Sequence, residues 1–224
     1  MTHPHRCLLL LVAILVIVAA MPSVACYSGL LVIPTADTVG ANKYDIELQV
    51  DGTTEKLKAD TYLLNTQFGL GNRLELGVDV DLHEKTDDRF LFNGKYVLAK
   101  SADGKLAIAA GVCNFSSTGD LDANPYLVAT RDFGVLRGTL GTTYLNKQTQ
   151  AIIGIDKALN PHLTLMADYT TGNNNYTSAA FNYHFTDRVG LMAGVELPNS
   201  SANDTRFSVH LVFNGPYRTA KGAK

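Results

Sequence analysis

The chain has 224 residues, no tryptophan, 46% apolar and 18% charged residues, and a formal net charge of −2. This composition excludes an intrinsically disordered chain. The near-neutral charge, without a long basic run, excludes a protein built to bind nucleic acid. The length allows one barrel or sandwich, or two small domains.

The first 25 residues have the character of an export signal. A weakly basic start precedes an unbroken apolar run from Leu8 to Ala20. The run is shorter than the about 20 apolar residues that a membrane-spanning helix needs, and it fits the hydrophobic part of a secretory signal. Because residues 23–25 have a small-x-small pattern, we predict that residues 1–25 are a signal peptide cleaved between Ala25 and Cys26.

Cleavage at that bond leaves Cys26 and Cys113 as the two cysteines of the mature chain. Export to an oxidising compartment allows a disulfide between them. Acylation of Cys26 is the alternative, although Ser23 stands where a lipoprotein signal normally has a large aliphatic residue. Two thiols do not make a zinc site, and we expect no metal and no cofactor.

After the signal, apolar and polar residues alternate with a period of two. In residues 74–82, leucines and valines alternate with Glu75, Gly77, Asp79 and Asp81. Such alternation predicts a strand with one apolar and one polar face. About twelve runs of this kind follow one another, of which the sixth and the eighth are the least regular: 44–51, 62–70, 74–82, 90–98, 106–112, 126–131, 136–144, 151–157, 163–170, 179–185, 189–197 and 207–213.

The connections between these runs alternate in length. Tight turns at 71–72, 101–104, 132–134, 160–161 and 186–188 are separated by connections at 52–60, 83–87, 114–124, 146–150, 171–175 and 198–204 that are mostly longer and more polar. Short turns at one end and long loops at the other are typical of outer-membrane barrels. Runs of about nine to eleven residues match a tilted strand that crosses hydrocarbon, whereas strands of soluble sheets have about 5 or 6 residues.

The sequence therefore predicts an all-β protein: a closed, antiparallel, up-and-down transmembrane β-barrel of about 12 strands in the bacterial outer membrane. We expect the barrel to span residues 44–213. An N-terminal periplasmic segment at 26–43 would precede it, and a C-terminal tail at 214–224 would follow it.

Three stretches resemble a known group of barrels. Residues 29–37, GLLVIPTAD, stand just before an alternating strand, and residues 68–78 read FGLGNRLELGV, with an echo at 185–197, FTDRVGLMAGVEL. These stretches resemble the N-terminal start and the repeated hairpin of YjbH-like and related outer-membrane β-barrel proteins. The resemblance implies an exported barrel and, as in some relatives, an association with exopolysaccharide export.

If the polar faces point inward, carboxylates on the first and third strands lie opposite bases on the fourth, sixth and seventh. The predicted lumen-facing charged residues are Asp45, Glu47, Glu75, Asp79, Asp81, Lys95, Arg131 and Arg137. Such charges either constrict a pore for small polar solutes or pair to fill an interior that conducts nothing. We therefore predict a non-catalytic protein, a porin-like narrow channel or a structural barrel. Its partners would be outer-membrane lipid and small polar solutes or polysaccharide.

Two other classes of protein stay open. One is a soluble exported or lipid-anchored β-sandwich binding module, in which the apolar faces would meet in a core. The other is an outer-membrane lipid hydrolase, with Ser208 as nucleophile, His210 as base, and Glu196 and His184 on neighbouring strands. Residues i and i+2 share a face in any strand, so the Ser208 and His210 pair also arises by chance.

Overall fold

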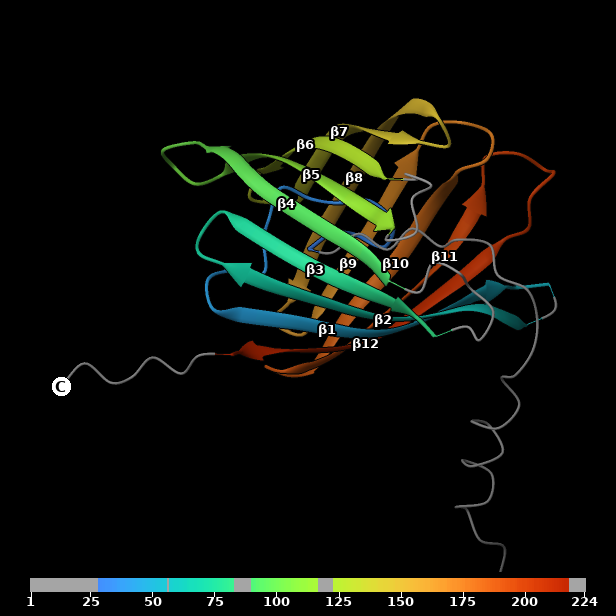
Figure 1. The fold of residues 1–224 in the computed structure, drawn as a ribbon, viewed down its shortest axis with the longest axis horizontal. Coiled ribbons are helices and arrows are strands. Elements are labelled where there is room, and N and C mark those ends of the chain that lie inside the picture. Colours follow the sequence, from blue (N-terminus) through green and yellow to red (C-terminus); the bar gives the residue numbers. More distant parts are fainter. Residues whose placement is uncertain (1–27, 56, 83–89, 117–122, 218–224) are drawn as a thin grey trace, which may run out of the picture.

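The computed structural model describes residues 28–55, 57–82, 90–116 and 123–217, which form one closed β-barrel (Figure 1). Each strand is antiparallel to its sequence neighbours, and β12 pairs with β1 to close the barrel. The described part of the chain contains no helix that could cross a membrane. The strands are β1 (Lys43–Thr53), β2 (Lys58–Leu70), β3 (Leu74–Asp81), β4 (Phe90–Lys100), β5 (Leu106–Ser116), β6 (Asn124–Asp132), β7 (Arg137–Leu145), β8 (Gln148–Asn160), β9 (Leu163–Thr170), β10 (Tyr176–Thr186), β11 (Val189–Pro198) and β12 (Arg206–Pro216).

Apolar side chains cover the outside of the barrel and polar side chains fill much of the inside. In β8, Ile153 and Ile155 are exposed, whereas the alternate residues Gln150, Ile152 and Gly154 are buried. In β2 and β3 the inward set is mostly polar, with Asn65 and Asp79 fully buried. This distribution confirms the predicted barrel and overturns the sandwich alternative, because the outer apolar faces do not meet in a core between two sheets.

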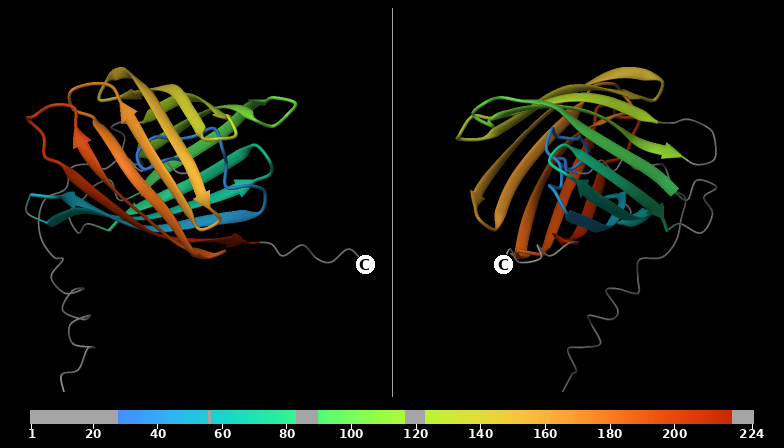
Figure 2. Two further views of the ribbon diagram at one scale, coloured as in Figure 1. Left: turned by 180° about the vertical axis from the view of Figure 1, so that it is seen from behind. Right: turned by 60° about the vertical axis from the view of Figure 1, so that its left-hand side comes forward.

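A short hairpin lies inside the barrel (Figure 2). Residues 28–35 fold back on themselves: Gly29 bridges to Pro34, and the Leu30 N–H donates to the Ile33 carbonyl at 2.9 Å. Residues 36–42 then lead along the interior to β1. The described residues of the predicted periplasmic segment at 26–43 therefore do not precede the barrel as a separate segment but occupy its interior.

The apolar part of the barrel interior surrounds this hairpin. Leu30, Leu31 and Ile33 of the hairpin are buried, and they belong to one cluster with Val97, Val128 and Ile152 from the barrel wall. Burial of these side chains stabilises the hairpin in the barrel, since each buried aliphatic side chain contributes about 1.5–3 kcal/mol relative to exposure.

The end of β12 lies beside the start of β1, where Pro216 pairs with Lys43. β12 continues to Pro216, three residues beyond the expected end of the barrel. The next residue, Tyr217, packs edge-on against Phe68, and its hydroxyl donates to the Gly69 carbonyl at 2.8 Å. The remainder of the predicted tail and the predicted cleavage site at Ala25 and Cys26 lie outside the described residues.

Cys113, near the end of β5, is disulfide-bonded. The other two cysteines of the chain, Cys7 and Cys26, lie outside the described residues. A bridge between Cys26 and Cys113 therefore stays a prediction.

Candidate functional site

The lumen of the barrel is lined by an excess of carboxylates. Among the charged side chains of the described residues that are buried, seven are acidic, and the basic ones are Lys95 and His210. The buried acids are Glu47, Asp51, Asp60, Glu75, Asp79, Asp168 and Glu196. Two arginines, Arg137 and Arg206, are half-buried and paired with Asp156 and Asp60. The interior is therefore polar and net acidic.

Most of the predicted lumen charges do line the interior. Glu47, Glu75, Asp79 and Lys95 are buried, and Asp45 lines an internal cavity. Asp81, at the end of β3, and Arg137, at the start of β7, are half-buried.

Arg131 is the exception, because it is exposed and its guanidinium lies 5.6 Å from the centre of the Phe133 ring. In β6 the inward set is Asn124, Tyr126, Val128 and Thr130, so the side chain of Arg131 points outward. The prediction for this residue was wrong because two polar residues follow one another at this end of β6, and Thr130 is the one that faces the lumen. An aromatic and an aliphatic side chain face inward there, and Gly111 on β5 leaves the space that the Tyr126 ring occupies.

Lys95 and Glu75 hold both ends of the hairpin. The Lys95 ammonium lies 3.7 Å from Glu75 Oε1 and donates to the carbonyls of Ser28, at 3.1 Å, and Asp37, at 2.8 Å. Glu75 Oε2 accepts hydrogen bonds from Ser28 Oγ, at 2.5 Å, and from the Val39 N–H, at 2.7 Å. One buried ion pair thus satisfies backbone groups at the start of the hairpin and just after its end.

Three further polar side chains of the wall bind the same segment. Asp168 Oδ2 accepts from the Val32 N–H at 3.2 Å, and Thr130 Oγ1 accepts from the Ala36 N–H at 2.9 Å. Arg137 forms an ion pair with Asp37. Since buried backbone groups need partners, these contacts fix the position of the segment as well as stabilise it.

Two glycines of the wall let the hairpin approach closely. A Cβ added at Gly154 on β8 would lie 2.3 Å from Leu30 Cδ1 and 2.8 Å from Ile33 Cδ1. A Cβ added at Gly194 on β11 would lie 2.8 Å from Leu31 Cδ2. Because these inward positions carry no side chain, the hairpin can pack directly against the backbone of the barrel wall.

Ser208 and His210 lie in a buried hydrogen-bond network that joins β12 to β1. Ser208 Oγ is 2.8 Å from His210 Nε2, and His210 Nδ1 is 2.6 Å from Glu47 Oε2. The acid is Glu47, not the predicted Glu196, and it reaches His210 only because β1 and β12 pair. His184, the other predicted partner, lines the cavity instead.

The network has the residue types of a hydrolytic triad but a proton arrangement that opposes catalysis. Ser208 Oγ donates to Asp51 Oδ1 at 2.5 Å, so its proton is engaged by a carboxylate. With that proton on the side of Asp51, His210 Nε2 donates to Ser208 Oγ and does not accept its proton, which is the reverse of what a hydrolytic base does. A carboxylate beside Ser208 would also repel the oxyanion of an acyl-transfer intermediate.

We expect Ser208→Ala to destabilise the barrel. We also expect that no lipid-cleaving activity of the protein depends on Ser208. The substitution leaves Asp51 Oδ1 and His210 Nε2 without this buried partner, which should cost about 1–3 kcal/mol. Urea unfolding in detergent and hydrolysis of phospholipid by the folded protein measure the two effects. A phospholipase activity in the unsubstituted protein that Ser208→Ala abolishes would establish the triad as catalytic.

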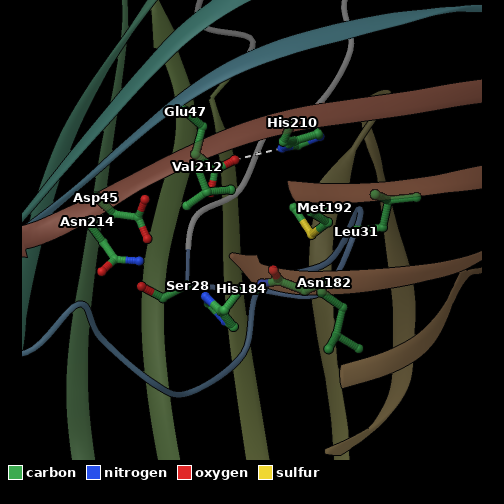
Figure 3. Close-up of a pocket in the computed structure, with 12 residues that line it drawn as sticks. Ser28, Leu31, Asp45, Glu47, Asn182, His184, Met192, His210, Val212 and Asn214 are labelled. Atoms are coloured by element: carbon green, nitrogen blue, oxygen red, sulfur yellow. Dashed lines mark hydrogen bonds and ion pairs between the residues drawn. The ribbon is translucent and has the colours of Figure 1, made fainter. Parts of the chain in front are cut away.

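A cavity of about 160 Å³ remains beside the hairpin (Figure 3). Its polar lining includes Asp45 and Glu47 from β1, Asn182 and His184 from β10, and His210 from β12. The hairpin forms the opposite wall through Ser28, Gly29, Leu30 and Leu31. This cavity is the space in the lumen that the hairpin leaves open on the side of β10 to β12.

A closed antiparallel barrel with an apolar exterior and a charged interior defines a class, the transmembrane β-barrels of the bacterial outer membrane. Comparison with solved structures agrees with this class. A KdgM porin structure aligns with a TM-score of 0.55 at 14% sequence identity, and covers 75% of this chain and 98% of that chain.

A second structure, titled "KdgM porin in complex with disordered oligogalacturonate", aligns with a TM-score of 0.58 at 14% identity, over 76% of this chain and 98% of that one. The outer membrane phospholipase of Salmonella typhi, a dimer with bound calcium, gives a TM-score of 0.43 at 13% identity, over 83% and 94% of the two chains. No protein-family model and no curated protein sequence matches the chain.

Proposed function

We propose that the protein is a non-catalytic, porin-like barrel with a narrow lumen that favours small cations and neutral polar solutes over anions. The excess of buried carboxylates in the lumen carries this proposal. The likeness of the fold to KdgM porin supports the porin-like part of it.

The charge balance of the lumen sets the preferred sign of the solute. A cleft lined by charges of one sign concentrates ions of the opposite sign, and rings of carboxylates select cations in channels. The buried ammonium of Lys95 is already engaged by Glu75 and by two carbonyls of the hairpin segment. It therefore offers little attraction to an anion that enters the lumen.

The hairpin sets the width of the path. A barrel of twelve strands is wider than an eight-stranded barrel filled by its own side chains, and narrower than an open porin of sixteen strands. Residues 28–35 take up part of this interior and leave the cavity described above. We therefore propose that the hairpin, rather than the barrel wall, limits conductance.

In planar bilayers under a KCl gradient, we expect a reversal potential displaced toward that of potassium. Asp79→Asn and Glu196→Gln should each reduce the displacement, because each removes a buried lumen carboxylate. Asp103→Asn is the matched control, since Asp103 is exposed in the turn between β4 and β5.

An anion-selective current would contradict the assigned sign of selectivity. Silence at adequate protein loading, with the hairpin in place or displaced, would leave a structural barrel without a channel.

Polysaccharide is the second candidate solute, in line with a role in exopolysaccharide export. The structure titled as a complex of KdgM porin with oligogalacturonate favours a saccharide. The carboxylate excess in this lumen disfavours an anionic one, because like charges would face each other in a narrow space. A neutral oligosaccharide that blocks the current, where an equally long anionic one does not, would support this assignment.

A further inference from the structure

The cavity beside the hairpin has the size of a small organic ion. Its volume of about 160 Å³ is several times the roughly 30 Å³ that one water occupies in the liquid. Its lining includes three apolar side chains, Leu31, Met192 and Val212, and the last two stand on the wall directly beside polar ones: Met192 pairs with Asn182 and Val212 with Glu47. Figure 3 shows these groups facing a common space.

The two carboxylates of the cavity differ in their partners. Asp45 and Glu47 are two residues apart on β1 and share its inward face. Glu47 is hydrogen-bonded to His210 at 2.6 Å. Among the described residues, no basic side chain forms an ion pair with Asp45. The cavity therefore holds one carboxylate without a direct counter-ion.

The same cavity contains acceptors that lack donors. Asp45 Oδ1 and Asn182 Oδ1 are buried, and neither has a hydrogen-bond partner within the described part of the chain. Both residues line the cavity, from β1 and β10 respectively. Buried polar atoms are nearly always bonded, so two unsatisfied acceptors in one cavity indicate a missing donor.

We infer that this cavity is a binding site for a small alkylammonium ion. An ammonium group carries three donors and a positive charge, which match the acceptors of Asp45 and Asn182 and the uncompensated carboxylate. A short alkyl chain would lie against Met192 and Val212. The inference deepens the proposed function, on which it rests for the route by which a cation reaches the cavity, and it names the solute class.

Titration calorimetry of the folded barrel in detergent with propylammonium chloride tests the site. We expect saturable binding that Asp45→Asn weakens about tenfold or more, since a charge-assisted hydrogen bond is lost. The matched control is Asp187→Asn, which removes an exposed carboxylate in the turn between β10 and β11. Propanol, with the same alkyl chain and no charge, should bind more weakly than propylammonium.

Binding to Asp45→Asn as tight as to the unsubstituted protein would overturn the inference, as would an equal loss in Asp187→Asn. If Asp45→Asn does not fold, Asn182→Ala removes the second acceptor and must weaken binding in its place.

The outcome separates the site from the channel. A cation-selective current without propylammonium binding refutes the site alone. Propylammonium binding without any current refutes the channel and leaves the site in place.

Discussion

Gly154→Val should displace the hairpin from the lumen and increase the conductance of the barrel. At this position even a Cβ comes within 2.3 Å of Leu30 Cδ1 and 2.8 Å of Ile33 Cδ1, whereas its nearest wall atom, the Ala167 carbonyl oxygen, is 3.5 Å away. The clash therefore falls on the hairpin and spares the barrel. Overpacking of this kind costs about 1–3 kcal/mol, which corresponds to about a 5–150-fold shift toward barrels with the hairpin displaced.

Single-channel recording of the two proteins measures this shift directly. The matched control is Gly94→Val on β4, where an added Cβ would meet only Leu76 Cδ2, at an ordinary 3.5 Å. Both substitutions replace a strand glycine by valine, and only the first one touches the hairpin. An unchanged conductance in Gly154→Val, with protease susceptibility of the N-terminal segment also unchanged, would show that the hairpin does not limit the path.

The fold could be predicted from the sequence because period-two alternation depends on the solvent at each face. Every predicted run corresponds to a strand, and the short turns at 71–72, 101–104 and 132–134 all join neighbouring strands. Boundaries were less accurate, since β8 extends from Gln148 to Asn160 where the pattern covers 151–157. Alternation weakens near strand ends, where the chain leaves the apolar belt.

The hairpin could not be predicted from its own residues. Leu30, Leu31 and Ile33 are apolar without strict alternation, and their contacts are with Gly154 and Gly194, far along the chain. The inward glycines Gly154 and Gly194 leave the space that the hairpin occupies. What would fill that space depends on contacts that only the closed barrel creates.

The hydrogen-bond network between β12 and β1 could likewise be predicted only in part from the sequence. The sequence indicated that Ser208 and His210 share a face, which the structure confirms at 2.8 Å. It did not indicate Glu47 or Asp51, because these residues lie across the pairing of the last strand with the first. Closure of the barrel therefore brings Glu47 and Asp51 next to His210 and Ser208. The hydrogen bonds that result oppose catalysis.

Ile153→Arg should cost far more stability than the same change near the end of the same strand. Ile153 is 47% exposed and pairs with Leu140 on β7 and Tyr169 on β9, which are exposed as well. In a membrane barrel such a position faces acyl chains, where an arginine costs about 2–4 kcal/mol at the midplane and about 0–1 kcal/mol near the interface. Leu159→Arg is the matched control, because Leu159 lies near the end of β8, beyond the exposed Lys157.

Denaturant unfolding of both variants in lipid vesicles measures the difference. We expect Ile153→Arg to lower the free energy of unfolding by about 2–4 kcal/mol and Leu159→Arg by about 1 kcal/mol or less. Equal effects would mean that no hydrocarbon belt surrounds β8. Because Ile153 and Gly154 are consecutive, Ile153→Arg and Gly154→Val test opposite faces of one strand. The substitution on the lipid-facing side should lower stability in the membrane, and the one on the lumen side should raise the conductance.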